Sequence, residues 1–119
     1  FIGTPKMNIL EINEENIVSE NTIKILGNDI QFDKISLKKS KHFVGIRPEH
    51  LKANQNTKFT FNPEIELIEN LGNEKIVYIK KDEHQLSAKI PSNIEIGNSI
   101  GFDPKDIFIF DLNGKRIKK

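Results

Sequence analysis

Apolar and polar residues alternate over several short stretches of the chain, a pattern typical of half-buried β-strands. Ile23 and Ile25 alternate with polar neighbours, and so do Ile30 and Phe32, on either side of the segment 26–29. That segment contains glycine and asparagine, which tolerate the positive φ of a tight turn. The two stretches are therefore predicted to form a hairpin.

Alternation returns over residues 58–62, 64–71, 75–80 and 85–90. The pattern slips at Leu67-Ile68, which predicts a β-bulge. No window of about 11 or more residues keeps a helical period. Short strands with closely spaced turn signals predict an all-β fold: one or more small antiparallel OB-like barrels, with Greek-key-like connections and only single-turn helices.

One eight-residue pattern occurs twice, at residues 44–51 and 100–107. Each copy reads apolar, glycine, apolar, polar, proline, charged, polar or charged, apolar. Proline fixes φ and lacks an N–H, so strand pairing must stop there, and proline suits the first position of a helical turn. Asp103 is expected to cap the second turn. The repetition predicts two related halves of a small β structure.

Composition narrows the classes of function. The 119 residues carry 18 basic and 17 acidic side chains, a balance that gives no reason to expect a nucleic-acid partner. The absence of cysteine excludes disulfides and thiolate metal sites, and it fits a reducing cytoplasm. No apolar run approaches the roughly 20 residues that span a bilayer.

Catalytic motifs are not found in the sequence. There is no phosphate-binding loop and no nucleophile elbow, and the three histidines lack the spacing of metal ligands. Glu64 and Glu66 fall on one face of a predicted strand and are interpreted as a solvated face rather than an acid–base pair. The chain is expected to have no catalytic activity and no cofactor of its own.

Two binding roles stand as alternatives. A single-stranded nucleic-acid-binding OB module would stack bases on Phe59, Phe61 and Tyr78, but the near-zero net charge favours a core role for the two phenylalanines. An oxyanion-sensing barrel would need clustered N–H, hydroxyl and lysine donors, for which segments 57–58 and 87–89 are weak signals.

Four segments, at residues 1–10, 44–51, 65–74 and 101–110 (the last with Asp111 and Gly114), resemble a single family in their order and spacing. The chain is similar to the C-terminal regulatory domain of the ATP-binding subunit of carbohydrate ABC importers of the maltose/maltodextrin type, the TOBE or transport-associated OB domain. The most specific segments are Phe-Ile-Gly-Thr-Pro-x-Met-Asn and Gly-Ile-Arg-Pro-Glu-His.

The resemblance implies a domain division and a parent protein. Residues 1–6 would be the tail of, or connection to, a preceding ATPase domain, and residues 7–119 the regulatory domain. The parent would be an ATPase of the translocase class that holds ATP and magnesium in its other domain. It would energise the import of maltodextrin-like or sn-glycerol-3-phosphate-like substrates, while this fragment remains non-catalytic.

The resemblance also implies partners and a location. The regulatory domains would form a homodimer, the parent would associate with membrane permease subunits, and a regulatory protein is a further possible partner. No nucleic-acid partner is expected. The parent complex would sit on the cytoplasmic face of the cell membrane as a peripheral assembly.

Six residues are candidates for the interface. The turn Leu71, Gly72, Asn73 and Glu74 matches a family segment at or near the pairing surface, and Gly72 is explained equally by a turn that needs positive φ.

The other two candidates lie in the first corner, where Arg47 and Glu49 form either polar contacts across a boundary or a local ion pair. Phe102, Phe108 and Phe110 are expected in the core.

Overall fold

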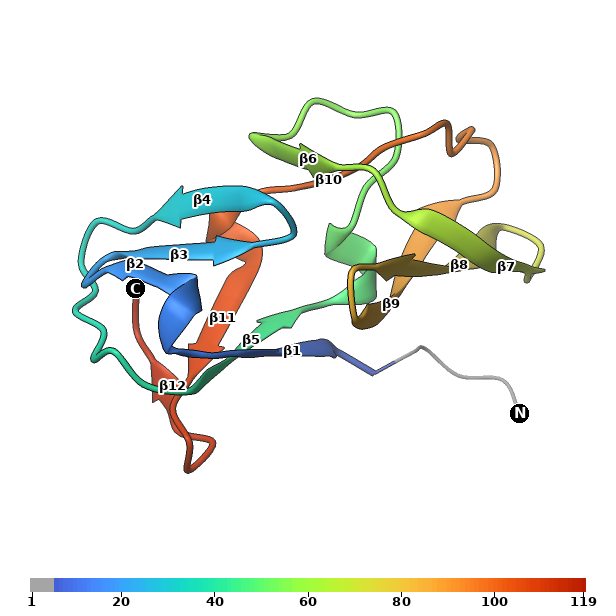
Figure 1. Ribbon diagram of the computed structural model, residues 1–119. Helices are drawn as coiled ribbons and strands as arrows, with labels where there is room; N and C mark the ends of the chain where they lie inside the picture. The colour runs from blue at the N-terminus through green and yellow to red at the C-terminus, as the bar shows by residue number, and fades with distance from the viewer. Residues whose placement is uncertain (1–5) are drawn as a thin grey trace.

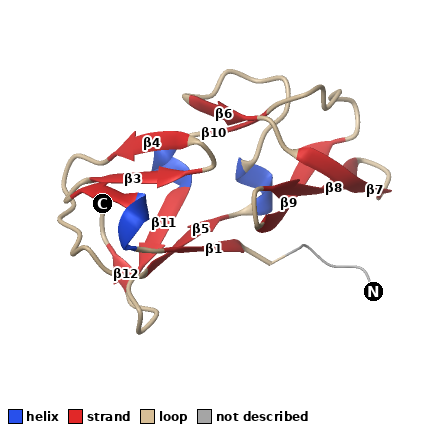
Figure 2. Cartoon of the chain, viewed as in Figure 1, coloured by secondary structure: helices blue, strands red, loops and turns tan. Residues whose placement is uncertain are grey.

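The computed structural model describes residues 6–119, and within that range every regular element is a strand or a single 3₁₀ turn (Figures 1 and 2). The turns are η1 (Glu14–Asn16), η2 (Pro48–His50) and η3 (Pro104–Asp106). The strands are β1 (Asn8–Ile12), β2 (Ile17–Ser19), β3 (Thr22–Ile25), β4 (Asn28–Gln31), β5 (His42–Ile46), β6 (Phe59–Phe61), β7 (Glu64–Asn70), β8 (Glu74–Lys81), β9 (His84–Pro91), β10 (Ile100–Phe102), β11 (Ile107–Phe110) and β12 (Arg116–Ile117). The all-β prediction with single-turn helices is confirmed. Of the connection predicted at residues 1–6, positions 1–5 lie outside the described residues.

The strands form four antiparallel sheets, with orders β1-β5-β11-β12, β10-β6, β2-β3-β4 and β7-β8-β9. Across residues 6–119 these small sheets do not join into one closed barrel. The prolines explain the interruptions. Pro48 and Pro104 each begin a 3₁₀ turn directly after a strand, and Pro63 separates β6 from β7. None of these residues has an N–H with which to continue a ladder.

The local turn predictions are confirmed. Strands β3 and β4 pair around Leu26 and Gly27, which both have positive φ, as a type I′ hairpin turn requires. In β7 the register with β8 shifts between Ile65 and Leu67, so the predicted bulge exists and lies slightly earlier than the slip in the pattern. Such a shift turns the following side chains to the other face of the strand.

The two copies of the repeated pattern lie side by side and pair reciprocally. Gly45 of the first copy is the register partner of Phe108, which directly follows the second copy. Gly101 of the second copy pairs with Lys52, which directly follows the first, through N–H to O distances of 2.9 and 2.8 Å. The prediction of two related halves is confirmed at this junction.

The cap expected at the second corner is wrong. Asp103 occupies the N-cap position of η3, but its side chain makes no capping hydrogen bond. One Asp103 carboxylate oxygen instead accepts the backbone N–H of Lys58 at 2.8 Å. The carboxylate therefore fastens the segment before β6 to the corner, and Pro104 alone favours the start of the turn.

A continuous apolar core runs beneath the sheets and includes Leu10, Ile46, Ile107 and Ile109. Phe102 is fully buried, as predicted, and Phe61 packs edge-on against it with ring centroids 6.1 Å apart.

Two aromatic residues depart from the core prediction. Phe108 and Phe110 are only half-buried, because β11 alternates and turns Ile107 and Ile109 to the core instead.

Asn8 connects two sheets from a nearly buried position, with 7% of its surface exposed. Its Nδ2 donates to the carbonyl oxygens of Ile46 at 3.0 Å and Ser87 at 2.9 Å. Its Oδ1 accepts the Ser87 N–H at 2.8 Å. One side chain thereby links β1, β5 and β9, and it fixes the β7–β9 sheet against the rest of the fold.

Candidate subunit interface

The β7–β8 hairpin carries a concentration of exposed apolar side chains. Strand β7 is the outer strand of its sheet, and all seven of its residues are exposed. Seven large apolar residues of the described chain are exposed, and four lie here: Ile65 at 41%, Leu67 at 60%, Ile68 at 47% and Leu71 at 46%. We call these four the hairpin patch. Apolar side chains gathered on one exposed element mark interaction sites more often than scattered residues do.

The hairpin patch continues from the core onto the surface. Ile65 and Ile68 are register partners of Ile79 and Val77, and both partners are fully buried. Directly paired residues share one face of a sheet, so Ile65 and Ile68 extend the core-facing side outward. Leu67 pairs with Tyr78 on the opposite face. The outer strand is therefore uncovered on both sides.

The turn at the hairpin tip is well ordered by hydrogen bonds. Leu71 N–H donates to the Glu74 carbonyl at 2.8 Å, Ser92 N–H donates to the Asn73 carbonyl at 2.9 Å, and the Ser92 hydroxyl donates to the Gly72 carbonyl. Gly72 has φ of +96°, and a Cβ placed on it would meet no atom within 4 Å. Gly72 is thus required for its backbone conformation, and the space around it is open.

Arg47 and Glu49 point to different neighbours. The local ion pair considered for them is not formed in the described part of the chain. The Arg47 guanidinium lies 5.4 Å from the centre of the Phe108 ring, and Arg116 lies 4.6 Å from the same ring. An arginine over an aromatic face is attracted by the ring quadrupole. Arg47 therefore contacts the Phe108 ring instead of the Glu49 carboxylate.

Glu49 lies near the hairpin tip. A surface hollow of about 190 Å³ between η2 and the β8–β9 strands is lined by both Glu49 and Glu74. Glu74 Oε1 lies 3.4 Å from Lys89 Nζ across this hollow. The structure therefore brings Glu49 and Glu74 to one hollow, whereas Arg47 faces β11 instead.

Tyr78 is held as a neutral donor beside the hairpin patch. Its hydroxyl donates to Glu69 Oε1 at 3.3 Å. Desolvation, followed by the negative charge of Glu69, raises the pKa of Tyr78 above its ordinary value. Tyr78 thus remains an uncharged phenol at neutral pH.

The described residues hold no group of three or more histidine, aspartate or glutamate side chains placed to bind a metal ion. No helix in residues 6–119 is long and apolar enough to cross a membrane.

The nucleic-acid alternative lacks a shared stacking platform. Phe61 is buried, and Phe59 stacks on Phe102 with ring centroids 5.8 Å apart. Tyr78 belongs to the other sheet, on β8. Single-strand binders stack successive bases on neighbouring exposed rings, which these three residues do not provide.

The Thr57 hydroxyl and the Ser87 N–H, two of the donors considered for an oxyanion, are used inside the fold. The Thr57 hydroxyl donates to the Phe59 carbonyl at 2.9 Å, and the Ser87 N–H is taken by Asn8. The two segments therefore do not form an anion site together.

Sequence reasoning found the tip of the hairpin but missed three members of the hairpin patch, Ile65, Leu67 and Ile68. A signal was present, because apolar residues at 65, 67, 68 and 71 cannot all face one side of a regular strand. At least one had to be turned toward solvent or a partner.

The curated proteins that are similar to this chain include ATP-binding proteins of importers. No family model matches the chain. A maltose/maltodextrin import ATP-binding protein MalK of Vibrio parahaemolyticus is 34% identical over 130 residues, covering 100% of this chain and 35% of that protein. The sn-glycerol-3-phosphate import ATP-binding proteins UgpC of Bordetella avium and Psychromonas ingrahamii are 27% and 33% identical, covering 99% and 95% of the chain.

The chain spans about a third of the length of these curated relatives. The resemblance inferred from the four sequence segments is thus confirmed along the whole chain, whose homologues are ATP-binding subunits of sugar and glycerol-phosphate ABC importers.

Proposed function

We propose that the chain is the non-catalytic regulatory and dimerisation domain of an ATP-binding subunit that energises carbohydrate import. The parent subunit would bind ATP and magnesium in a separate domain and associate with membrane permease subunits on the cytoplasmic face. The observation that carries the pairing role is the hairpin patch, four exposed apolar side chains gathered on one outer strand and its turn.

A second copy of this chain is the occupant proposed for the hairpin patch. In a two-fold contact the same surface of each copy faces the other copy, so a single apolar surface is buried on both copies. Edge-to-edge pairing of two β7 strands would gather Glu64, Glu66 and Glu69 of both copies in one ladder, and like charges there are destabilising. A contact through Ile65, Ile68 and Leu71 leaves those carboxylates at the solvated rim.

The pairing should be weak for the isolated chain. A patch of four apolar residues buries far less than the roughly 1,600 Å² of a standard stable interface, and association also loses translational and rotational freedom. In the parent, contacts elsewhere would make this encounter effectively intramolecular. The regulatory domains would then keep two ATPase subunits together while their nucleotide sites open and close.

Sedimentation equilibrium of charge-inserted variants tests the proposal. Ile65→Glu and Ile68→Glu should abolish the concentration-dependent dimer, because each places a carboxylate in the buried contact. Leu112→Glu is the matched control, since Leu112 is 58% exposed and lies in a different turn. A strict monomer at the highest soluble concentration would contradict the proposal, as would equal loss of pairing in the Leu112 control.

A further inference from the structure

A second surface feature, separate from the hairpin patch, is a basic hollow at the second corner. It encloses about 430 Å³ between the end of β4, the start of β6 and η3. Four lysines line it, Lys34, Lys58, Lys105 and Lys119, and Asp33 is the one carboxylate among its lining residues. We call it the lysine hollow.

The local excess of positive charge contrasts with the whole chain. The sequence has 18 basic against 17 acidic residues, yet this hollow gathers four amines with one carboxylate. In the described part of the chain, the ion pairs involve Lys41, His50 and Lys89, and none involves a lysine of the hollow. Mutual repulsion of the four amines makes a bound anion favourable.

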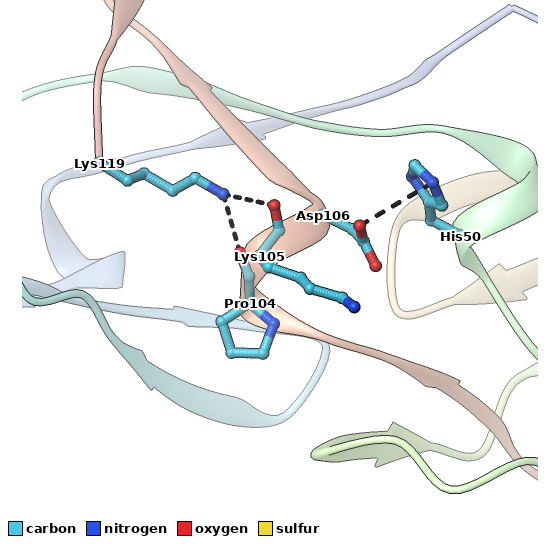
Figure 3. A network of polar contacts seen from close by, with 5 residues as sticks. All are labelled: His50, Pro104, Lys105, Asp106 and Lys119. Carbon is cyan, nitrogen blue, oxygen red and sulfur yellow. Dashed lines mark hydrogen bonds and ion pairs between the residues drawn. The ribbon is translucent and has the colours of Figure 1, made fainter.

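Lys119 is held in place by the corner itself. Its Nζ donates to the carbonyl oxygens of Pro104 at 2.9 Å and Lys105 at 3.0 Å, as Figure 3 shows. An ammonium group has three hydrogens, so one donor remains for a ligand. Partial burial, then the charge of Arg116, lowers the pKa of Lys119, while Asp106 acts in the opposite direction. An anion beside it would favour the charged amine.

Two neighbouring carboxylates have other direct partners. Asp103 accepts the Lys58 backbone N–H, and Asp106 faces His50, with Oδ1 3.9 Å from Nε2 (Figure 3). Asp33 alone opposes the four amines from within the lining.

The first corner shows that this basic character is not required by the fold. In the repeated pattern Glu49 occupies the position that Lys105 takes in the second copy. The hollow beside Glu49 is smaller, about 190 Å³, and holds the Glu74–Lys89 pair. Equivalent backbone therefore carries mixed charge at one corner and concentrated positive charge at the other.

We propose that the lysine hollow binds a small phosphorylated molecule through its phosphate group. Lysine ammonium groups are point-charge donors well suited to phosphate oxygens, and the volume falls in the range of small-molecule pockets. Phe32 and Pro104 supply apolar lining for the carbon part of the ligand. The four lysines line one concave hollow rather than a strip, which favours a small molecule over an acidic protein segment. The inference is independent of the proposed pairing.

NMR titration of the isotopically labelled chain tests the site, with glucose 6-phosphate, inorganic phosphate and glucose as probes at low ionic strength. We expect saturable shifts in the amides of residues 33–34, 58 and 105 with both phosphate probes, and none with glucose. Lys58→Gln and Lys105→Gln should each weaken binding by about tenfold, the effect of one lost charge-assisted contact. Lys24→Gln and Lys115→Gln remove the same charge from exposed positions outside the hollow and should leave binding unchanged.

The alternatives have distinct outcomes. Absence of saturable shifts with both phosphate probes would overturn the proposal. Equal weakening in the two control variants would also overturn it, by reducing the effect to general charge screening. Tighter binding of a polyglutamate peptide than of glucose 6-phosphate would replace the proposal with a protein-docking surface. An unchanged spectrum of each free variant verifies that all four remain folded.

Discussion

His50 Nε2 lies 3.9 Å from Asp106 Oδ1, and the two residues occupy the same position in the two copies of the repeated pattern (Figure 3). Each is the last residue of a 3₁₀ turn that starts with proline. The contact therefore joins equivalent points of two related corners. Together with the pairing of Gly45 with Phe108 and of Gly101 with Lys52, it shows that the halves are assembled around a shared junction.

The His50–Asp106 contact should contribute modestly to stability. The His50 and Asp106 side chains are 32% and 15% exposed, and a pair of this kind is worth about 0.2–1 kcal/mol while His50 is protonated. A double-mutant cycle with His50→Gln and Asp106→Asn, measured by urea unfolding, should give a coupling in that range that shrinks with added salt. A coupling that is unaffected by salt would show that the two residues interact through packing instead.

Gly101 should not tolerate a side chain. A Cβ at this position would clash with Thr57 Oγ1 and lie 2.9 Å from Thr57 Cβ. Gly101→Ala is expected to lower the free energy of unfolding by about 1–3 kcal/mol, the usual cost of overpacking. Thr57→Ala in the same chain should recover part of that loss, because it removes two of the three clashing atoms.

Gly45→Ala is the natural comparison. The nearest atom to a Cβ there is Met7 Sδ, at 2.5 Å, and it belongs to a flexible side chain. The cost in urea unfolding should be smaller than for Gly101→Ala. Equal or greater destabilisation by Gly45→Ala would contradict the packing argument.

Asn8 should be the most sensitive polar residue in the fold. Asn8→Ala leaves the Ile46 carbonyl and both backbone groups of Ser87 without their partner. We expect a loss of about 3 kcal/mol in the free energy of unfolding, since each buried unsatisfied group costs about 1–3 kcal/mol. Hydrogen exchange should also accelerate at the Ser87 amide. Unchanged exchange there would show that Asn8 does not hold β9.

Alkaline pH should separate Tyr78 from Lys119. The pKa of Tyr78 is raised in the folded chain. The stability that Tyr78 contributes to the fold is therefore fully present below the ordinary pKa of 10.0 and is lost as pH rises through the folded pKa. The pKa of Lys119 is lowered, so folding is penalised at lower pH and the penalty is relieved as pH rises toward 10.5.

Urea unfolding from pH 8 to pH 11 measures both slopes. Tyr78→Phe should reduce the fall in the free energy of unfolding above pH 10. Lys119→Gln should steepen that fall, because it removes the stability that the wild-type chain regains as Lys119 loses its proton. A shift in the same direction for both variants would contradict these assignments.

Much of the fold was predictable from local signals. The glycine–asparagine turn after Ile25 and the prolines at 48 and 104 determine backbone conformation over a few residues, and the hairpin and both corners follow from them. The role of Asn8 depends on Ser87, 79 residues away, and no local pattern encodes that contact. The Arg47–Phe108 contact was missed for the same reason, as was the open edge that exposes Ile65 and Ile68.

The central claim is that two copies meet through the hairpin patch, and distance measurement between spin labels tests it most directly. The chain has no cysteine, so Asn73→Cys and Asn113→Cys each allow a single label. Figure 1 shows the β7–β8 and β11–β12 turns at opposite ends of the molecule. We predict a short intermolecular distance between labels at position 73 and a much longer one at position 113. A short distance at position 113, or no intermolecular distance at position 73 at any concentration, would contradict the account.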